Sequence, residues 1–152
     1  MWKGWLMKRL AIGADHRGFT FKEFLVQQQT IAERLVQWVD VGVDQVVQTD
    51  YPHYAFKVAK KILADEADAG ILLCGTGIGM SMAANRFKRI YAALVWNTEL
   101  AKRAREEDDA NVLVLPADYL EQQEMLDIVG VWLTTDFLGE HYQNRLRELD
   151  MF

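Results

Sequence analysis

Short apolar segments that alternate with stretches of helical spacing constrain this chain more than any other feature of its sequence. Five segments are rich in the apolar, β-branched and aromatic residues of strands, and apolar residues recur at roughly helical intervals after each one. Because parallel strands need a crossover between them, usually a helix, this alternation favours an α/β fold with a parallel sheet. The expected strands are 10–13, 35–41, 69–73, 90–95 and 112–115.

The expected helices complete this pattern. In the first helix, apolar residues at helical intervals extend from Phe19 to Ile31. Further helices are expected to begin at Asp50 and to cover 80–87, 99–107, 121–133 and 139–149. The sequence therefore predicts a doubly wound, Rossmann-like, five-stranded parallel sheet with helices on both faces and an extra C-terminal helix. Ligand chemistry is expected at the carboxyl ends of the strands, which right-handed crossovers place along one edge.

Length, charge and cysteine usage limit the classes of function. The 152 residues suit one domain, taken as 7–152, with residues 1–6 as a short N-terminal extension. A net charge of −5 without a long basic run disfavours nucleic acid and membrane surfaces as partners, and no apolar run approaches the ~20 residues of a membrane span. The single cysteine excludes an intramolecular disulfide and a multi-cysteine metal site, so the cytoplasm is the expected compartment.

Three candidate groups lie where this fold places a site. Asp15 and His16 follow the first expected strand, Tyr51 follows the second, and Cys74 ends the third. Their coincidence at the carboxyl ends of three strands is the strongest indication of function that the residues give without further comparison. Each also has a simpler interpretation: Asp15 as a helix cap, His16 as a surface imidazole, and Tyr51 as a packing residue.

Glycine at every second position characterises the loop that follows Cys74. Gly75, Gly77 and Gly79 allow the backbone to approach a ligand and direct several N–H groups into one concavity, which suits a phosphate or an enediolate. The alternative is a tight strand-to-helix turn. The spacing matches neither the dinucleotide fingerprint nor a P-loop, so no nucleotide cofactor is expected. Cys74 is either a small core residue or, beside a helix N-terminus that lowers thiol pKa, a thiolate base or nucleophile.

Taken together, these motifs resemble the type B ribose-5-phosphate isomerase family. That family also contains the galactose-6-phosphate isomerase subunits and the allose-6-phosphate isomerases. The resemblance covers about residues 7–149 and is most specific where Asp-His, Asp-Tyr-Pro-His and Cys-Gly-Thr-Gly-Ile-Gly occur in this order. The matching segments are 13–18, 49–54, 71–79, 83–85 and 111–113.

The resemblance implies a sugar-phosphate isomerase without metal or cofactor that forms a homodimer, or a dimer of dimers, with shared active sites. Cys74 then moves a proton between C1 and C2, while Thr76 and the amides of 75–79 stabilise the enediolate. Asp15 handles the hydroxyl proton. The residues that contact the substrate are His16, Tyr51, the three loop glycines, Asp108, His141 and Arg145.

This chain departs from the family pattern at three places. Glu107 and Asp108 replace a ring-opening histidine and the asparagine after it, Asp118 replaces an arginine, and His141 replaces the first of two phosphate-binding arginines. Glu107 thereby becomes the candidate acid for ring opening. Ribose 5-phosphate is the leading substrate, a four- or six-carbon sugar phosphate (erythrose 4-phosphate, allose 6-phosphate or galactose 6-phosphate) is the alternative, and a non-catalytic module that binds small anions is the competing class.

Overall fold

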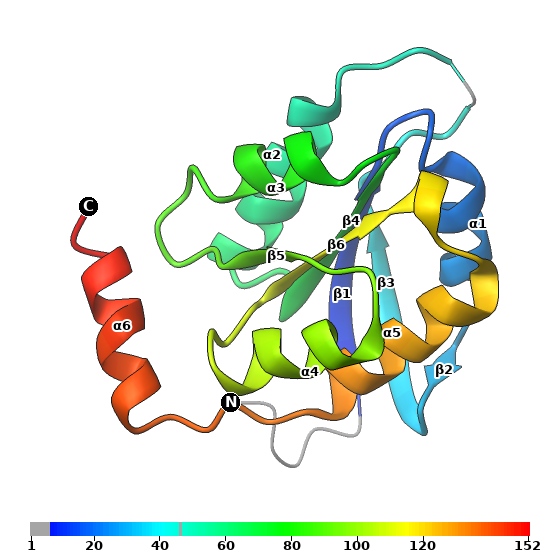
Figure 1. Ribbon diagram of the computed structural model, residues 1–152. Helices are drawn as coiled ribbons and strands as arrows, with labels where there is room; N and C mark the ends of the chain where they lie inside the picture. The colour runs from blue at the N-terminus through cyan, green and yellow to red at the C-terminus, as the bar shows by residue number, and fades with distance from the viewer. Residues whose placement is uncertain (1–6, 46) are drawn as a thin grey trace.

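The computed structural model describes residues 7–45 and 47–152, in which helices cover both faces of a twisted sheet (Figure 1). The expectation of an extension at residues 1–6 lies outside the described residues. The sheet has the order β2-β3-β1-β4-β6-β5, and every neighbouring pair is parallel except β2 and β3. Its strands are β1 (Met7–Ala14), β2 (Thr30–Ile31), β3 (Arg34–Asp40), β4 (Ala69–Cys74), β5 (Ala92–Leu94) and β6 (Val112–Pro116). The predicted doubly wound parallel sheet is confirmed.

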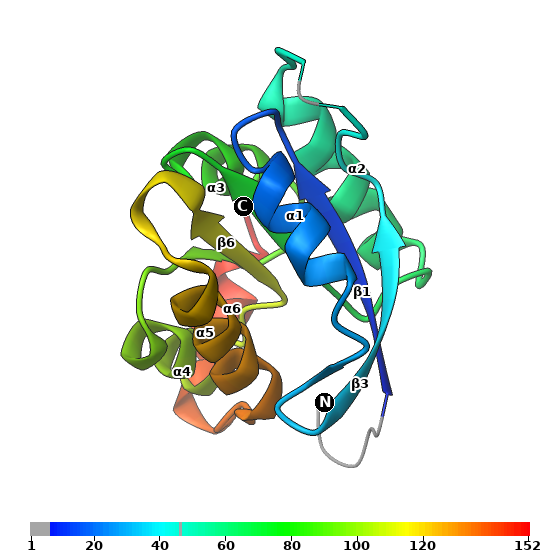
Figure 2. The same cartoon turned by 90° about the vertical axis from the view of Figure 1, so that its right-hand side faces the viewer.

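Two sets of helices enclose the sheet, as Figure 2 shows from the side. Helices α1, α4 and α5 share one apolar cluster with the sheet, and α2 and α3 share another on the opposite face. None of the helices in the described ranges is long and apolar enough to cross a membrane. The helices are α1 (Phe19–Val26), α2 (Tyr51–Leu63), α3 (Ile78–Ala84), α4 (Thr98–Glu106), α5 (Gln122–Thr134) and α6 (His141–Leu149), with a 3-10 turn η1 (Ala117–Tyr119).

The alternation of side chains along the central strands decides which face each residue joins. In β4, Ile71 and Leu73 belong to the cluster with α1, α4 and α5, whereas Leu72 and Cys74 belong to the cluster with α2 and α3. This is the period of two that any pleated strand imposes. Cys74 therefore points to the face on which α3 begins.

The first helix is shorter than the sequence predicted, and a sixth strand forms where its C-terminal end was expected. Helix α1 ends at Val26, and Ile31 lies in β2, which pairs antiparallel with β3. The two strands join through Ala32 and Glu33, whose φ angles are +47° and +63°. Such turns usually carry Gly or Asn, so this one left no signal in the sequence. The prediction of a helix up to Ile31 and of five strands is wrong in this respect.

The chain leaves two neighbouring strands in opposite directions. From β1 it passes through α1 to β3, and from β4 it passes through α3 to β5 on the other side of the sheet. Such a divergence is a topological switch point, where doubly wound proteins bind their ligands. The residues that follow β1 and β4 therefore meet at the edge where the sequence placed its candidates.

Helix α6 stands apart from the sheet, beyond β5 (Figure 1). At its C-terminal end the Asp150 carboxylate accepts hydrogen bonds from the Tyr91 hydroxyl at 2.7 Å and from the Arg89 amide at 3.1 Å. Before the helix, the Leu138 amide donates to the Glu106 carbonyl at 3.0 Å. The extra C-terminal helix is confirmed, and these contacts anchor both of its ends.

Candidate active site

Cys74 ends β4 with its thiol turned into the loop that follows. The residue is only 5% exposed, and its Sγ accepts a hydrogen bond from the Gly77 amide at 3.2 Å. Gly77 has φ +76°, and a Cβ there would lie 2.4 Å from a Leu94 methyl carbon, so only glycine suits the turn. The glycine-rich loop therefore curls its amides back toward the thiol.

The pKa of the Cys74 thiol is raised, which corrects the expectation that the helix N-terminus lowers it. Burial of the thiol is the largest cause, and the charge of Asp15 acts in the same direction. The amides of Met80, Gly77 and Thr76 oppose the increase. The loop thus stabilises the thiolate in the way the sequence suggested, but desolvation outweighs it. The thiol is the resting form of Cys74 at neutral pH.

Asp15 lies in the turn that follows β1 and is 6% exposed. Its Oδ1 accepts hydrogen bonds from the amides of Arg17 at 2.9 Å and Gly18 at 3.2 Å, and its own amide donates to the Leu73 carbonyl at 3.3 Å. Both amides belong to the turn before α1, whose N-cap is Gly18 without a side-chain cap, so the simpler interpretation of Asp15 as a helix cap is wrong. The same turn brings the Asp15 charge into range of the Cys74 thiol.

Two further candidates, His16 after β1 and Tyr51 at the start of α2, lie at this edge. The Thr49 amide donates to His16 Nδ1 at 3.4 Å. The Tyr51 ring lies against Gly79, where a Cβ would come within 2.6 Å of the ring. A larger residue at position 79 would push the ring away. Asp15, His16, Tyr51 and residues 74–79 therefore gather at one edge, and we call them the Cys74 group.

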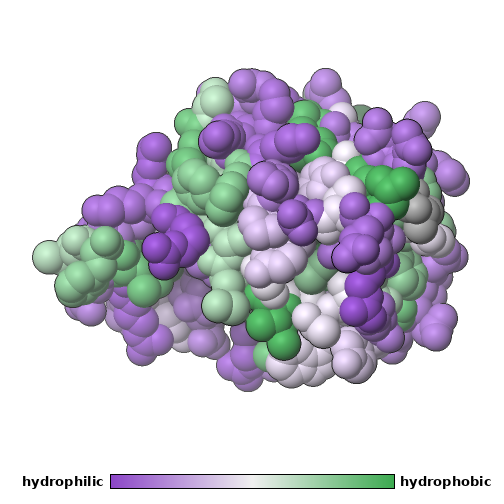
Figure 3. All heavy atoms as spheres, turned by 90° about the horizontal axis from the view of Figure 1, so that it is seen from above, coloured by the Kyte–Doolittle hydropathy of each residue, from purple (hydrophilic) through white to green (hydrophobic). Residues whose placement is uncertain are grey.

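A hollow with apolar walls opens beside Thr76, whose Oγ1 accepts a hydrogen bond from the Ile78 amide at 3.3 Å. Its volume is about 350 Å³. Trp96 and Tyr119 on its wall are 56% and 72% exposed. Figure 3 looks onto this end of the molecule and shows hydrophobic patches among hydrophilic residues. The lining residues are Thr76, Ile78, Leu94, Trp96, Pro116 and Tyr119.

An ion pair that the sequence did not suggest crosses this loop. The Arg17 guanidinium donates to the Asp118 carboxylate, and a Cβ on Gly75 would lie 2.6 Å from the guanidinium carbon and 2.8 Å from the carboxylate. The Asp118 amide also donates to the Gly75 carbonyl at 3.0 Å. Where the resemblance expects an arginine, this chain thus places a carboxylate that pairs with an arginine from the first loop.

The remaining candidates form a second cluster, which we call the Asp108 group: Glu107, Asp108, His141 and Arg145. Glu107 follows α4 and accepts a hydrogen bond from Arg103 Nη1 at 3.0 Å. Partial burial and the charge of Glu107 raise the pKa of Asp108, while the charge of Arg145 opposes the increase. On α6, the Arg145 guanidinium lies 5.3 Å from the centre of the Tyr142 ring, and the His141 ring centre lies 4.0 Å from the same ring.

The two groups do not meet within one chain. Glu107 and Asp108 precede β6, at the amino edge of the parallel sheet, whereas Cys74 lies at the carboxyl edge. Strand β6 has 5 residues, and at ~3.3 Å per residue it separates the edges by roughly 16 Å. In Figure 1, α6 lies on the opposite side of the molecule from the carboxyl ends of β1 and β4. The resemblance implies sites shared between subunits, and within one chain the two groups lie apart.

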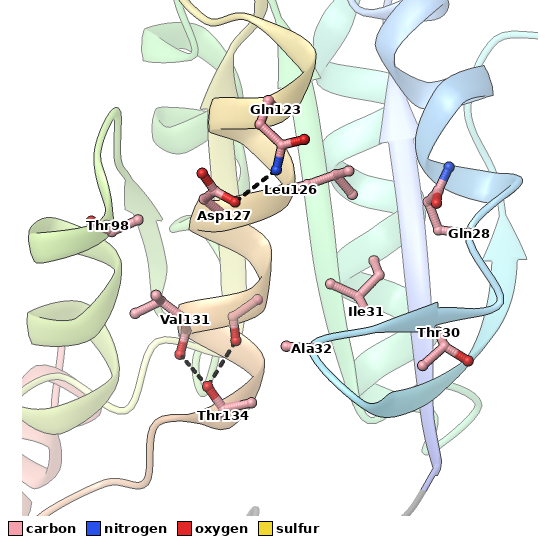
Figure 4. Close-up of a pocket in the computed structure, with 11 residues that line it drawn as sticks. Gln28, Thr30, Ile31, Ala32, Thr98, Gln123, Leu126, Asp127, Val131 and Thr134 are labelled. Carbon is pink, nitrogen blue, oxygen red and sulfur yellow. Dashed lines mark hydrogen bonds between the residues drawn. The ribbon is translucent and has the colours of Figure 1, made fainter.

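A larger pocket lies away from both groups. It has a volume of about 610 Å³ and opens between the β2–β3 turn and α5, where Gln28, Asp127 and Thr134 line it (Figure 4). No candidate residue lies in its wall. Across residues 7–45 and 47–152, no cluster of three or more His, Cys, Asp or Glu side chains could hold a metal ion.

Comparison with known proteins gives concordant matches over nearly the whole chain. A family model described as Ribose/Galactose Isomerase matches residues 10–149. Ribose-5-phosphate isomerase B of Escherichia coli is 38% identical over 143 residues, 94% of this chain and 95% of that protein. A ribose 5-phosphate isomerase structure from Thermotoga maritima has a TM-score of 0.88 at 39% identity and covers 95% of this chain and 99% of that one. For the type B enzyme of Trypanosoma brucei the TM-score is 0.91 at 38% identity, with 95% and 98% covered.

Proposed function

This chain belongs to the ribose/galactose isomerase family, and we propose that it interconverts ribose 5-phosphate and ribulose 5-phosphate by a proton transfer that uses no cofactor. Its relatives make it an aldose–ketose isomerase of sugar phosphates. One observation carries the proposal: a buried thiol, a carboxylate and an amide-rich loop lie together at the switch point of the sheet. These are a base, a second proton carrier and an anion site.

In the proposed reaction, the Cys74 thiolate removes the proton from C2 of the open-chain aldose. The C–H electron pair forms the C1–C2 double bond, and negative charge moves to O1. Asp15 carries the hydroxyl proton from O2 to O1, and return of the first proton to C1 completes the ketose. One oxygen of Asp15 is held by two amides, so the other remains for the substrate. A positioned base of this kind contributes about 10²–10⁴-fold in rate.

The loop after Cys74 supplies the stabilisation of the enediolate. Its amides already lower the cost of negative charge on the Cys74 sulfur, and the same donors face an oxyanion that forms next to it. Thr76 adds a hydroxyl at the mouth of the loop. Preorganised donors of this type are worth about 10²–10³ each in rate. His16 and Tyr51 then hold the substrate from the adjoining loops.

We further propose that each active site combines the Cys74 group of one subunit with the Asp108 group of its partner, in a homodimer or a dimer of dimers. Two observations support this arrangement. The two groups lie at opposite edges of one chain. The apolar wall beside Thr76 includes Ile78, which is 56% exposed, and Met82 on α3 is 69% exposed. A second subunit would cover such large hydrophobic side chains.

Ribose 5-phosphate is the proposed substrate, with four- and six-carbon sugar phosphates as the alternatives. Five- and six-carbon aldose phosphates form rings that must open before C2 can lose its proton, which gives Glu107 the task of an acid. A tetrose 4-phosphate cannot close such a ring through its phosphorylated oxygen and needs no acid. The ability of Glu107 to donate a proton therefore matters for five- and six-carbon sugars, which form rings, and not for a tetrose 4-phosphate.

A panel of aldose phosphates tests the proposal. Purified protein is assayed for ketose formation from ribose 5-phosphate, erythrose 4-phosphate, allose 6-phosphate and galactose 6-phosphate, after dialysis against a metal chelator. We expect the highest kcat/KM with ribose 5-phosphate, no loss on chelation, and no activity in the Cys74→Ser variant purified in parallel. A higher kcat/KM with another sugar would reassign the substrate, and activity restored by a divalent ion would exclude the cofactor-free reaction.

A further inference from the structure

We propose that Arg17 is a further catalytic residue: its guanidinium donates to the enediolate oxygens at the Cys74 loop, and Asp118 is the positioning residue that holds it there. The inference rests on the proposed function and adds to it a charged donor for the reacting end of the sugar. The position of the guanidinium, its remaining donors and the exposure of the ion pair support this role.

The position of Arg17 is set from both sides of the switch point. Its backbone lies in the β1–α1 turn, where its amide donates to Asp15 Oδ1 at 2.9 Å. Its side chain lies against Gly75, because a Cβ there would be 2.6 Å from both Cζ and Nε. Gly75 follows the proposed base directly. The positive charge is therefore one residue from Cys74, in a space that only a glycine leaves open.

The guanidinium keeps donors for a ligand. It has five N–H groups in a planar fork, and Nη2 donates to Asp118. Among the contacts of the described residues, the guanidinium donates no second hydrogen bond. The side chain is 54% exposed, so the remaining donors face the open edge of the site. A planar cation with a free edge matches the two adjacent oxygens of an enediolate.

The place of Arg17 in the site favours the reacting end of the substrate over the phosphate. Cys74 must contact the hydrogen on C2, and Gly75 adjoins Cys74, so a group that covers Gly75 faces C1 and C2. The phosphorus of a pentose 5-phosphate is several bonds away from these carbons. Arg145, the phosphate ligand that the resemblance implies, belongs to the other group. Arg17 therefore acts where negative charge develops during the reaction.

The exposure of the ion pair separates a catalytic role from a structural one. The Arg17 and Asp118 side chains are 54% and 33% exposed, and exposed pairs contribute little to stability. Lys61 and Glu66 form a comparable pair, 35% and 55% exposed, in a part of the chain that contains no candidate residue. Lys61→Ala is thus a matched control for the loss of a cation and its surface ion pair.

The test compares Arg17→Ala with Lys61→Ala in the full-length protein. Two probes are used: a hydroxamate analogue of the aldose phosphate, which mimics the planar enediolate, and inorganic phosphate. For Arg17→Ala we expect kcat and hydroxamate affinity each to fall at least about tenfold, with phosphate affinity within about twofold of wild type. Arg17→Lys should recover part of the loss, because it restores the charge without the fork. Lys61→Ala should behave as wild type in all three measurements.

Asp118 is tested through Arg17. Asp118→Ala should lower kcat by less than Arg17→Ala, and the double variant should lose no more than Arg17→Ala alone, since the carboxylate acts only by holding the guanidinium. Additive losses would remove this positioning role. The proposal for Arg17 is overturned if Arg17→Ala matches the Lys61 control, or if phosphate affinity falls while kcat is kept. Turnover of ribose 5-phosphate by the wild type tests the proposed function. Hydroxamate binding, measured by calorimetry, tests Arg17 separately, because it can be measured in every variant whether or not that variant turns over ribose 5-phosphate.

Discussion

The Cys74 group and the Asp108 group differ in how the protein holds them. The first lies on loops that leave neighbouring central strands, and it is fixed by buried backbone contacts and by glycines that admit other side chains. The second lies at the end of α4 and on α6, a helix anchored mainly at its ends. Two of the three departures from the family pattern, Glu107 and His141, also fall in the second group. The fold therefore constrains the group proposed to carry the chemistry more tightly than the group proposed to contact the rest of the substrate.

The largest effect should come from the centre of the Cys74 group. Cys74→Ser is nearly isosteric, but the pKa of an alcohol is far too high for a base at neutral pH. We expect kcat to fall by about 10²–10⁴-fold, the usual contribution of a general base. Circular dichroism and the thermal midpoint should remain near those of the wild type. Turnover within a few-fold of wild type in a folded variant would remove Cys74 from the mechanism.

Mixed dimers test whether the two groups belong to different subunits. Cys74→Ser and Arg145→Ala chains are co-expressed with two affinity tags, and dimers that carry both are isolated. If each site joins both subunits, one site in the mixed dimer is intact, and activity should return to about half of wild type. Each homodimer should remain far less active at substrate concentrations below the wild-type KM. A mixed dimer no more active than the mean of the two homodimers would place both groups in a single subunit.

The pH dependence of the rate tests the pKa of the Cys74 thiol, which burial raises and the loop amides lower. Burial and Asp15 raise the pKa of the thiol, so the thiolate is the minor form at neutral pH. Below that pKa its fraction increases about tenfold per pH unit, and kcat/KM should increase with it between pH 7 and 8.5. Asp15→Asn removes one cause of the raised pKa and should move the profile to lower pH, whatever its effect on the maximum rate. A rate independent of pH over this range would contradict the assignment of the thiolate as base.

The smallest and most selective effect should come from the Asp108 group. Glu107→Gln removes an ionisable proton but keeps the size and polarity of the side chain. We expect turnover of ribose 5-phosphate, which is mostly cyclic, to fall several-fold more than turnover of an open-chain tetrose phosphate, because only the ring needs an acid. Equal losses on the two substrates would mean that Glu107 serves the structure, through its hydrogen bond with Arg103, or another proton transfer.

The amino-acid sequence by itself determined the features that depend on short stretches of chain. Periodicity located the five parallel strands and the helix after each one, and the glycine spacing after Cys74 marked the loop at the site. These signals are local, because a strand alternates every two residues and a helix repeats every 3.6. The β2–β3 turn escaped detection since Ala32 and Glu33 take positive φ angles without glycine.

The tertiary structure alone decided what depends on distant parts of the chain. Strand order made β1 and β4 neighbours and put Glu107 at the opposite edge. It also joined Arg17 to Asp118 across Gly75, a pair 101 positions apart in sequence. The tertiary structure likewise decided that the pKa of the Cys74 thiol is raised and not lowered. The amides that lower it lie within six residues, but the burial that raises it comes from helices and strands packed along the whole chain, and burial is the larger effect.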